Sequence, residues 1–164
     1  MNKKFGVIVT GLSFATLCAA AAADPLPKSG SINLHSATRT AFEILPIADK
    51  LGQAHGDGRG VTFNDKGSGL LHLGPLDCTF ASFITKDTGK NKGYCAFGDA
   101  DGDRLFTEFT GTFSLTDGHS QGMNDVVGGT GKYAGITGGG PWKCQAAGAN
   151  GETQCTHRID YKMP

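Results

Sequence analysis

Three aspartates alternate with other residues in the turn Asp99–Asp103, and this spacing is the most metal-like feature of the chain. Oxygen ligands at positions 1, 3 and 5 begin a calcium loop of the EF-hand type, which also needs glycine at position 6 and glutamate at position 12. Those two positions hold Arg104 and Thr110, and strand-like sequence flanks the turn. We therefore interpret Asp99, Asp101 and Asp103 as a solvated hairpin turn, with weak metal binding as the alternative.

Glu108 is the carboxylate best placed to act as a general acid. It lies in the middle of the longest predicted strand, Arg104–Leu115, between Phe106 and Phe109. If its face lined an interior, burial would raise its pKa and suit it to proton transfer. Phe109 and other large apolar residues occupy the opposite face, so the alternation favours an outward Glu108. Glu43 is the second acid considered for this role.

The run Gly128–Lys132 (GGTGK) looks suited to a phosphate group but does not complete a nucleotide-binding motif. A Walker A loop needs serine or threonine after the lysine and must lead into a helix. Tyr133 occupies that place, and the glycines that follow would end any helix. We interpret these glycines as allowing a sharp bend in a curved sheet.

Motifs for other reactions are missing from the sequence. No serine lies in the Gly-x-Ser-x-Gly pattern of a hydrolase nucleophile. His72, His119 and His157 lie in or beside predicted strands, and we interpret each as a surface or structural histidine. No cofactor is expected. Phe106, Tyr133 and Trp142 are the aromatic residues considered as lining for a ligand cavity.

The cysteines predict two disulfides. Cys18 lies in the apolar start of the chain, and the other four cysteines allow three connectivities. Two local hairpins favour 78–95 and 144–155: pairing residues whose numbers sum to 173 places Cys78 opposite Cys95, and a sum of 299 places Cys144 opposite Cys155. No C-x-x-C motif is present, which disfavours a zinc site.

The first 23 residues read as a secretory signal peptide. A basic start (Lys3 and Lys4) precedes an apolar run and then Ala21–Ala23. Removing this leader leaves 141 of the 164 residues, with 13 basic and 15 acidic side chains and a net charge of −2. The balance disfavours nucleic-acid binding, and no further long apolar run predicts a membrane span. We expect a mobile segment over 24–30, one domain over 31–164, and a periplasmic or secreted location.

Glycine and short strands dominate the rest of the chain. The leader contains two of the 26 glycines, which leaves 24 in 141 residues, about one in six against a usual ~7%. Such density disfavours helices and suits turns and bent strands. We expect a loop at Gly52–Gly60 and two extended stretches meeting at Pro46. The main predicted strands are 60–64, 69–73, 76–85, 93–98, 104–115, 119–127, 142–147 and 153–161. Short connections imply an all-β antiparallel meander that forms a sandwich or barrel.

The segment Val127–Pro141 (VGGTGKYAGITGGGP) resembles the glycine-rich signature of the allene oxide cyclase and dirigent barrel superfamily, and its surroundings resemble small exported bacterial members. The resemblance covers about residues 76–137. It implies an eight-stranded antiparallel barrel with a partly apolar lumen. Relatives guide cyclisation of a fatty-acid epoxide or coupling of phenolic radicals, and no functional residue of theirs is carried over to this chain.

Three functions follow from these observations. The first is a non-catalytic exported barrel that binds a small apolar or aromatic molecule, since an eight-stranded barrel is wide enough for one small ligand. The second is a cyclase- or isomerase-like enzyme with Glu108 or Glu43 acting from the barrel wall. The third is a protein-interaction or inhibitor module that uses the loops at 99–103 and 138–141. The sequence leaves the oligomeric state open.

Overall fold

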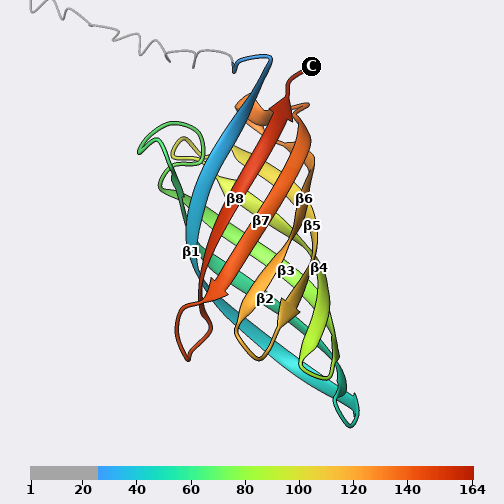
Figure 1. The fold of residues 1–164 in the computed structure, drawn as a ribbon. Helices are drawn as coiled ribbons and strands as arrows, with labels where there is room; N and C mark the ends of the chain where they lie inside the picture. The colour runs from blue at the N-terminus through green and yellow to red at the C-terminus, as the bar shows by residue number, and fades with distance from the viewer. Residues whose placement is uncertain (1–25) are drawn as a thin grey trace, which may run out of the picture.

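A closed eight-stranded antiparallel barrel is formed by residues 26–164, the part of the chain described in this computed structural model (Figure 1). Each strand pairs with the next, and β1 pairs with β8 to close the cylinder. The elements are β1 Ser29–Ala48, β2 Leu51–Asn64, β3 Gly74–Thr85, β4 Thr88–Gly98, β5 Arg104–Ser114, β6 His119–Gly129, the 3-10 helix η1 Gly131–Tyr133, β7 Thr137–Ala146 and β8 Glu152–Lys162. The prediction of an all-β antiparallel barrel is confirmed. The predicted signal peptide lies outside the described residues.

Alternation between the two sheet faces builds the core. Along β8, Cys155, His157, Ile159 and Tyr161 are buried while the residues between them are exposed. Successive side chains of a strand point to opposite faces, so one face of every strand meets at the barrel axis. The interior therefore receives every second residue.

Both disulfides are present with the predicted connectivity and register. Cys78 pairs with Cys95 across β3 and β4 with a Cα–Cα distance of 4.1 Å, and Cys144 pairs with Cys155 across β7 and β8 at 4.0 Å. The pairing sums of 173 and 299 hold along the two hairpins. Each bridge thus links directly opposed residues on neighbouring strands.

The loop predicted at Gly52–Gly60 is wrong, because this segment belongs to β2. Its glycines alternate along the strand instead of marking a turn. A Cβ on Gly56 would lie 2.2 Å from the carbonyl oxygen of Ala41, and one on Gly60 would lie 2.0 Å from that of Ala37. The missing side chains let the strongly bent β1 backbone approach β2 closely.

The strand predicted at Gly69–Leu73 is also wrong, because residues 65–73 form successive turns. Leu71 and Leu73 adopt positive φ values of 59° and 54°. Polar side chains of β2 hold the segment in place: Thr62 Oγ1 donates to the Leu71 carbonyl at 2.6 Å, and Asn64 Nδ2 donates to the Leu70 carbonyl at 2.8 Å. Leu71 is fully buried and closes one end of the barrel.

The longest strand is β1, with 20 residues, and not the predicted segment that became β5. β1 continues through Pro46, where two stretches were expected to meet, and its pairing with β2 becomes irregular only between Pro46 and Ala48. Figure 1 shows the resulting β1–β2 hairpin projecting beyond the neighbouring hairpins. Phe42, Ile44 and Leu45 on this projection are more than half exposed.

Candidate functional site

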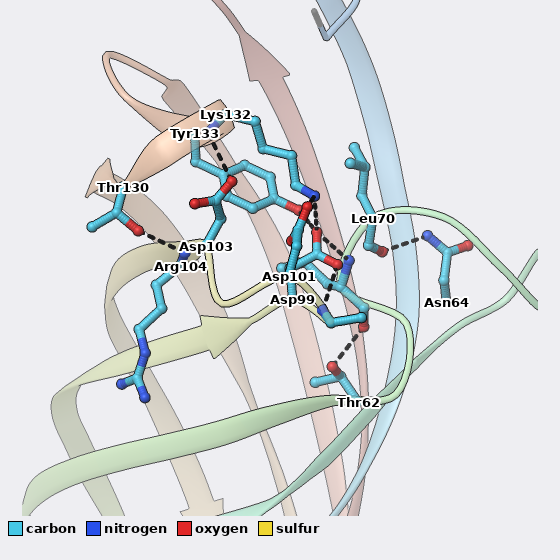
Figure 2. Close-up of polar contacts among 12 residues, drawn as sticks. Thr62, Asn64, Leu70, Asp99, Asp101, Asp103, Arg104, Thr130, Lys132 and Tyr133 are labelled. Atoms are coloured by element: carbon cyan, nitrogen blue, oxygen red, sulfur yellow. Dashed lines mark hydrogen bonds and ion pairs between the residues drawn. The ribbon is translucent and has the colours of Figure 1, made fainter. Parts of the chain in front are cut away.

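One end of the barrel is closed by a buried polar network around Asp99 (Figure 2). The Tyr133 hydroxyl donates to Asp99 Oδ2 at 2.5 Å, and Lys132 Nζ lies 3.0 Å from the same oxygen. Lys132 Nζ also contacts Asp101 at 2.7 Å, while the Ala100 N–H donates to Asp99 Oδ1 at 2.8 Å. The Leu71 N–H points to Asp99 Oδ2 from the capping turns at 3.4 Å. The first aspartate of the turn therefore holds the end of the barrel together.

The network fixes the charge of its members. Burial acts to raise the pKa of Asp99, but hydrogen bonds from Tyr133 and Lys132 outweigh it and hold that pKa below its usual value. Burial and then the bond to Asp99 raise the pKa of Tyr133. Burial acts to lower the pKa of Lys132, and its bonds to Asp101 and Asp99 reverse this into a net rise. Asp99 is thus a carboxylate paired with an ammonium group and a neutral phenol.

The glycine-rich segment after β6 is what brings Lys132 and Tyr133 to the aspartates. Gly131 has φ 51°, and a Cβ there would lie 1.7 Å from Asp103 Oδ1. Asp103 Oδ2 accepts the Lys132 N–H at 3.0 Å, and the Arg104 N–H donates to Thr130 Oγ1 at 2.9 Å. The GGTGKY sequence therefore ties its own turn to the aspartate turn, and its backbone donors serve that contact.

The opposite half of the lumen contains a cavity of about 390 Å³. Its wall is mainly apolar and includes all four paired cysteines. Phe42 and Ile44 of the projecting hairpin, together with Leu115, stand at its mouth and are exposed. A second depression of about 930 Å³ adjoins it and shares Phe113 and His119 with it. Within the part of the chain that the structure describes, the cavity therefore opens toward the end that carries the projecting β1–β2 hairpin.

Glycines on the inner face make room for this cavity by letting aromatic rings lie against the wall. A Cβ on Gly89 would lie 2.2 Å from the Phe113 ring, and one on Gly93 would lie 2.7 Å from the Phe109 ring. The Trp142 ring lies over Gly111 in the same way, since a Cβ on that glycine would lie 2.4 Å from the ring. Phe109 and Trp142 then meet edge to face with ring centroids 5.7 Å apart. The three rings therefore pack against glycine backbone in the barrel wall.

One row of opposed residues crosses the cavity wall from β4 to β8. Asn91 opposes Gly111, Gly111 opposes Gly122, Gly122 opposes Trp142, and Trp142 opposes His157. The two glycines in the middle form a shelf without side chains. Polar side chains therefore lie on both sides of the glycine pair on one level of the barrel, and the Trp142 ring covers Gly111.

Four buried side-chain atoms within residues 26–164 have no hydrogen-bond partner, and all four belong to residues that line this cavity. They are Asn91 Oδ1, Asn124 Nδ2, Trp142 Nε1 and His157 Nδ1. Buried polar groups are normally paired, so each unpaired group in a folded protein needs an explanation. Their common location marks this cavity as the candidate functional site.

His157 is neutral in this setting. Its Nε2 lies 3.1 Å from Ser36 Oγ, and its ring meets Phe97 edge to face at 5.4 Å. Burial lowers the pKa of His157 to about 4. The interpretation of His157 as a structural histidine holds for one ring nitrogen, because Nδ1 faces the site without a partner.

The acids considered for catalysis lie outside the lumen. Glu108 is on the outer face of β5, where Lys92 Nζ forms an ion pair with it at 2.5 Å and the Tyr94 hydroxyl donates to it at 3.3 Å. The hydrogen bond from Lys92 holds the pKa of Glu108 below its usual value. Glu43 is exposed and lies 3.5 Å from His55 Nε2. Neither carboxylate can act on a molecule inside the barrel from these positions.

The three aromatic residues considered as cavity lining lie in different parts of the barrel. Trp142 lines the cavity, Phe106 lies on the outer face of β5 beside Glu108, and Tyr133 is fully buried in the closed end. Sequence reasoning did not single out Asn91 or Asn124. A usable signal existed for His157, since the 299 pairing that joins the second cysteine pair also opposes Trp142 to His157.

Asp99 and Asp101 converge on the Lys132 ammonium group, whereas Asp103 accepts from the Lys132 backbone N–H. Their carboxylates bond to Tyr133, Lys132 and the backbone. Asp99 is 8% exposed, so the solvated turn expected at this position is wrong for its first residue. In the described part of the chain, no group of three or more His, Cys, Asp or Glu side chains is arranged to hold a metal ion. Over the same residues, no helix has the length and apolar character needed to cross a membrane.

Comparisons with known proteins support the fold. No protein-family model and no curated protein matches this sequence. Among solved structures, the chain is similar to the pterocarpan synthase dirigent protein GePTS1, with a TM-score of 0.50 and 14% sequence identity over 92% of this chain and 100% of that chain. At this level of identity the similarity concerns the fold. The protein therefore has a dirigent-like barrel fold with two disulfides.

Proposed function

We propose that this protein is an exported barrel that binds a small apolar or aromatic molecule in the open half of its lumen, without catalysis. The observation that carries the proposal is the cavity of about 390 Å³, which falls in the size range of small-molecule sites and is lined mainly by apolar side chains. Phe80, Phe109 and Trp142 supply aromatic surface inside it.

The chemistry of the lining supports binding over catalysis. Among the described residues that line the cavity, the only acid is Glu152. Hydrogen bonds from the backbone N–H groups of Glu152 and Asn150 hold the pKa of Glu152 below its usual value. A general acid needs a pKa near the working pH, and Glu152 departs in the opposite direction. The cyclase-like alternative thus has no carboxylic acid poised as a proton donor among the described residues of the lining, and the neutral His157 favours simple accommodation of an uncharged molecule.

Export is part of the same proposal. Two disulfides are typical of proteins from oxidising compartments, which supports the predicted signal peptide and a periplasmic or secreted location. N-terminal sequencing of the protein recovered from its host tests this, with a mature chain beginning at Asp24 as the expected result and retention of residues 1–23 as the contrary one. The dirigent-like fold is consistent with a ligand-holding barrel, although fold alone does not determine function.

Binding is tested with Nile red, a neutral apolar dye whose fluorescence rises in apolar surroundings. We expect saturable binding of one dye per barrel. Thr38→Phe places a ring inside the cavity and should abolish the signal, whereas Thr79→Phe places the same ring on the outer face of β3 and should leave it unchanged. Equal binding by both variants would show that the dye does not occupy the lumen.

A further inference from the structure

The positions of the unpaired polar atoms specify what kind of molecule the cavity takes. Asn124 lies on β6 and Trp142 on β7, and both point into the cavity. Asn124 opposes Gly140, two residues from Trp142, so the two side chains are diagonal neighbours on one face of the sheet. Diagonal side chains on adjacent strands are close enough to contact a common partner. Two donors therefore face one region of the cavity.

Both donors are deeply buried and unpaired. Trp142 is 6% exposed and Asn124 is 2% exposed. The Thr107 hydroxyl donates to Asn124 Oδ1 at 3.3 Å, which uses the acceptor of that amide and leaves Nδ2 free. The indole N–H of Trp142 can only donate. A carbonyl oxygen has two lone pairs and can accept from both groups at once.

Among the described residues, the lining of the cavity offers no lysine or arginine to pair with an anionic group. Glu152 adds negative charge at the mouth of the cavity. Burying a carboxylate without a paired cation is strongly unfavourable. His157 remains neutral near pH 7 and does not supply that cation. Anionic amphiphiles are therefore poor ligands for this lumen.

Acceptors and further hydrogen bonds lie along the same row. Asn91 Oδ1 lies over Gly111 beside the Trp142 ring, since a Cβ on Gly111 would come within 2.9 Å of this oxygen and 2.4 Å of the ring. Asn91 Oδ1 can accept from a hydroxyl group. His157 Nδ1 lies on the other side of Trp142 and has one hydrogen bond to make in either tautomer. The polar groups of this row would thus contact the polar atoms of a bound molecule, while the aromatic rings and disulfides of the lining contact its apolar surface.

We propose that the ligand is an uncharged aromatic ketone or related carbonyl compound with a hydroxyl group, whose carbonyl oxygen accepts hydrogen bonds from Trp142 Nε1 and Asn124 Nδ2 and whose hydroxyl donates to Asn91. This rests on the proposed function, because it specifies the occupant of the same cavity. It makes Trp142 and Asn124 specificity-determining residues: they discriminate against molecules of the same shape that lack the carbonyl.

The test uses three probes built on the same two-ring frame. 4-Hydroxybenzophenone has both the carbonyl and the hydroxyl, 4-benzylphenol lacks the carbonyl, and 4-benzoylbenzoate carries a negative charge. Calorimetric titration of the oxidised protein should show 4-hydroxybenzophenone binding about tenfold more tightly than 4-benzylphenol, since a neutral hydrogen bond contributes about 0.5–1.5 kcal/mol and two are involved. 4-Benzoylbenzoate should bind at least tenfold more weakly than 4-hydroxybenzophenone.

Substitutions of Trp142 and Asn124 test whether these two donors cause the preference for 4-hydroxybenzophenone over 4-benzylphenol. Trp142→Phe and Asn124→Leu should each reduce the tenfold preference to about threefold, and the double variant should remove it. Met123→Leu, on the outer face of β6, is the matched control and should keep the full preference. Because the readout is a ratio of affinities within one protein sample, a partly unfolded variant lowers both affinities and leaves the ratio interpretable.

A ratio near one in the unmodified protein, a ratio unchanged in the double variant, or tight binding of 4-benzoylbenzoate would each overturn this inference. None of these results affects Nile red binding in the lumen, so the proposed function would stand. Loss of Nile red binding to the unmodified protein would overturn the proposed function itself.

Discussion

The buried polar groups at the two ends of this barrel differ in whether they have hydrogen-bond partners. At the closed end, Asp99, Lys132 and Tyr133 satisfy one another within 3.0 Å. In the open half, Trp142 and Asn124 keep donors that nothing in the described chain accepts. A paired buried group stabilises the fold, whereas an unpaired one costs free energy until a partner arrives. The comparison assigns a structural role to the polar groups of the closed end and supports the proposal that those of the open half recognise a ligand.

Asp99→Ala should produce the largest loss of stability. It leaves the Lys132 ammonium and the Tyr133 hydroxyl without their main acceptor in a buried place, and breaking a buried ion pair costs about 3–5 kcal/mol. Urea unfolding measures the change in the free energy of unfolding. Asp101→Ala is the control, because it removes a half-exposed partner of the same lysine and should cost about 0–1 kcal/mol. Equal losses would show that burial of the network does not matter.

Removing a disulfide tests what stabilises the open half of the barrel. The cavity leaves this half without a filled core, so aromatic rings and disulfides must stabilise its wall. Cys144→Ala combined with Cys155→Ala should lower the free energy of unfolding by about 3 kcal/mol, the usual effect of a bridge that closes a short loop. Hydrogen exchange should locate the loss of protection in β7 and β8 and leave the amides around Tyr133 slow. Loss spread evenly over both ends would contradict the division between them.

The two ends should respond to acid in different pH ranges. The pKa of His157 is about 4 in the folded protein and about 6.5 when unfolded. Between these values the unfolded chain binds more protons, so the free energy of unfolding falls as pH drops from about 6.5 to 4, by about 3 kcal/mol in all. The contribution of Asp99, whose pKa is lowered by folding, is lost only below its ordinary value of 3.8.

Urea unfolding from pH 8 to pH 3 checks this order. His157→Gln should flatten the curve between pH 6.5 and 4 and keep the steep fall at lower pH. A variant curve parallel to that of the unmodified protein would show that another group titrates in this range.

Apart from the control substitutions, Tyr133→Phe should have the smallest effect on stability. It removes only the hydroxyl that donates to Asp99, and a hydrogen bond to a charged group contributes about 1.5–3 kcal/mol. Tyr94→Phe removes a hydroxyl that contacts Glu108 on the exposed outer surface and should leave the free energy of unfolding unchanged. Thermal melts of the pair give the comparison directly, and equal melting temperatures would argue against a strong bond at Asp99.

The sequence was sufficient to predict how the strands that contain the cysteines pair. Two opposed cysteine pairs fix the registers of two hairpins, and each register determines which side chains of the paired strands share a face. It was insufficient for Gly52–Gly60, since glycine marks turns and close strand crossings alike and only the neighbouring backbone distinguishes them. Residues 69–73 have strand-like composition, but side chains of β2 capture their carbonyls.

The site was predictable only in part. Alternation already favoured an outward Glu108, and Trp142 was among the residues considered for the cavity. Asn91 and Asn124 remained hidden because their significance depends on hydrogen bonds that are not made. A missing bond leaves no pattern in a linear sequence. The tie between GGTGKY and Asp99–Asp103 was missed because it joins segments about 30 residues apart through side chains.

The seam between β1 and β8 has a consequence for how the chain reaches this structure. It pairs Ser29 with Lys162 and continues to Arg39 with Glu152, so the partners are more than 110 positions apart, while both sulfur bridges lie inside single hairpins. Contacts between distant positions carry the greatest loop-closure entropy and form slowly. We expect the antiparallel meander to form first as a curved open sheet. Pairing of its two edge strands, β1 and β8, should then be the rate-limiting step of folding. Until then both edges expose unpaired amides, which makes the unclosed sheet prone to pair with a neighbouring chain.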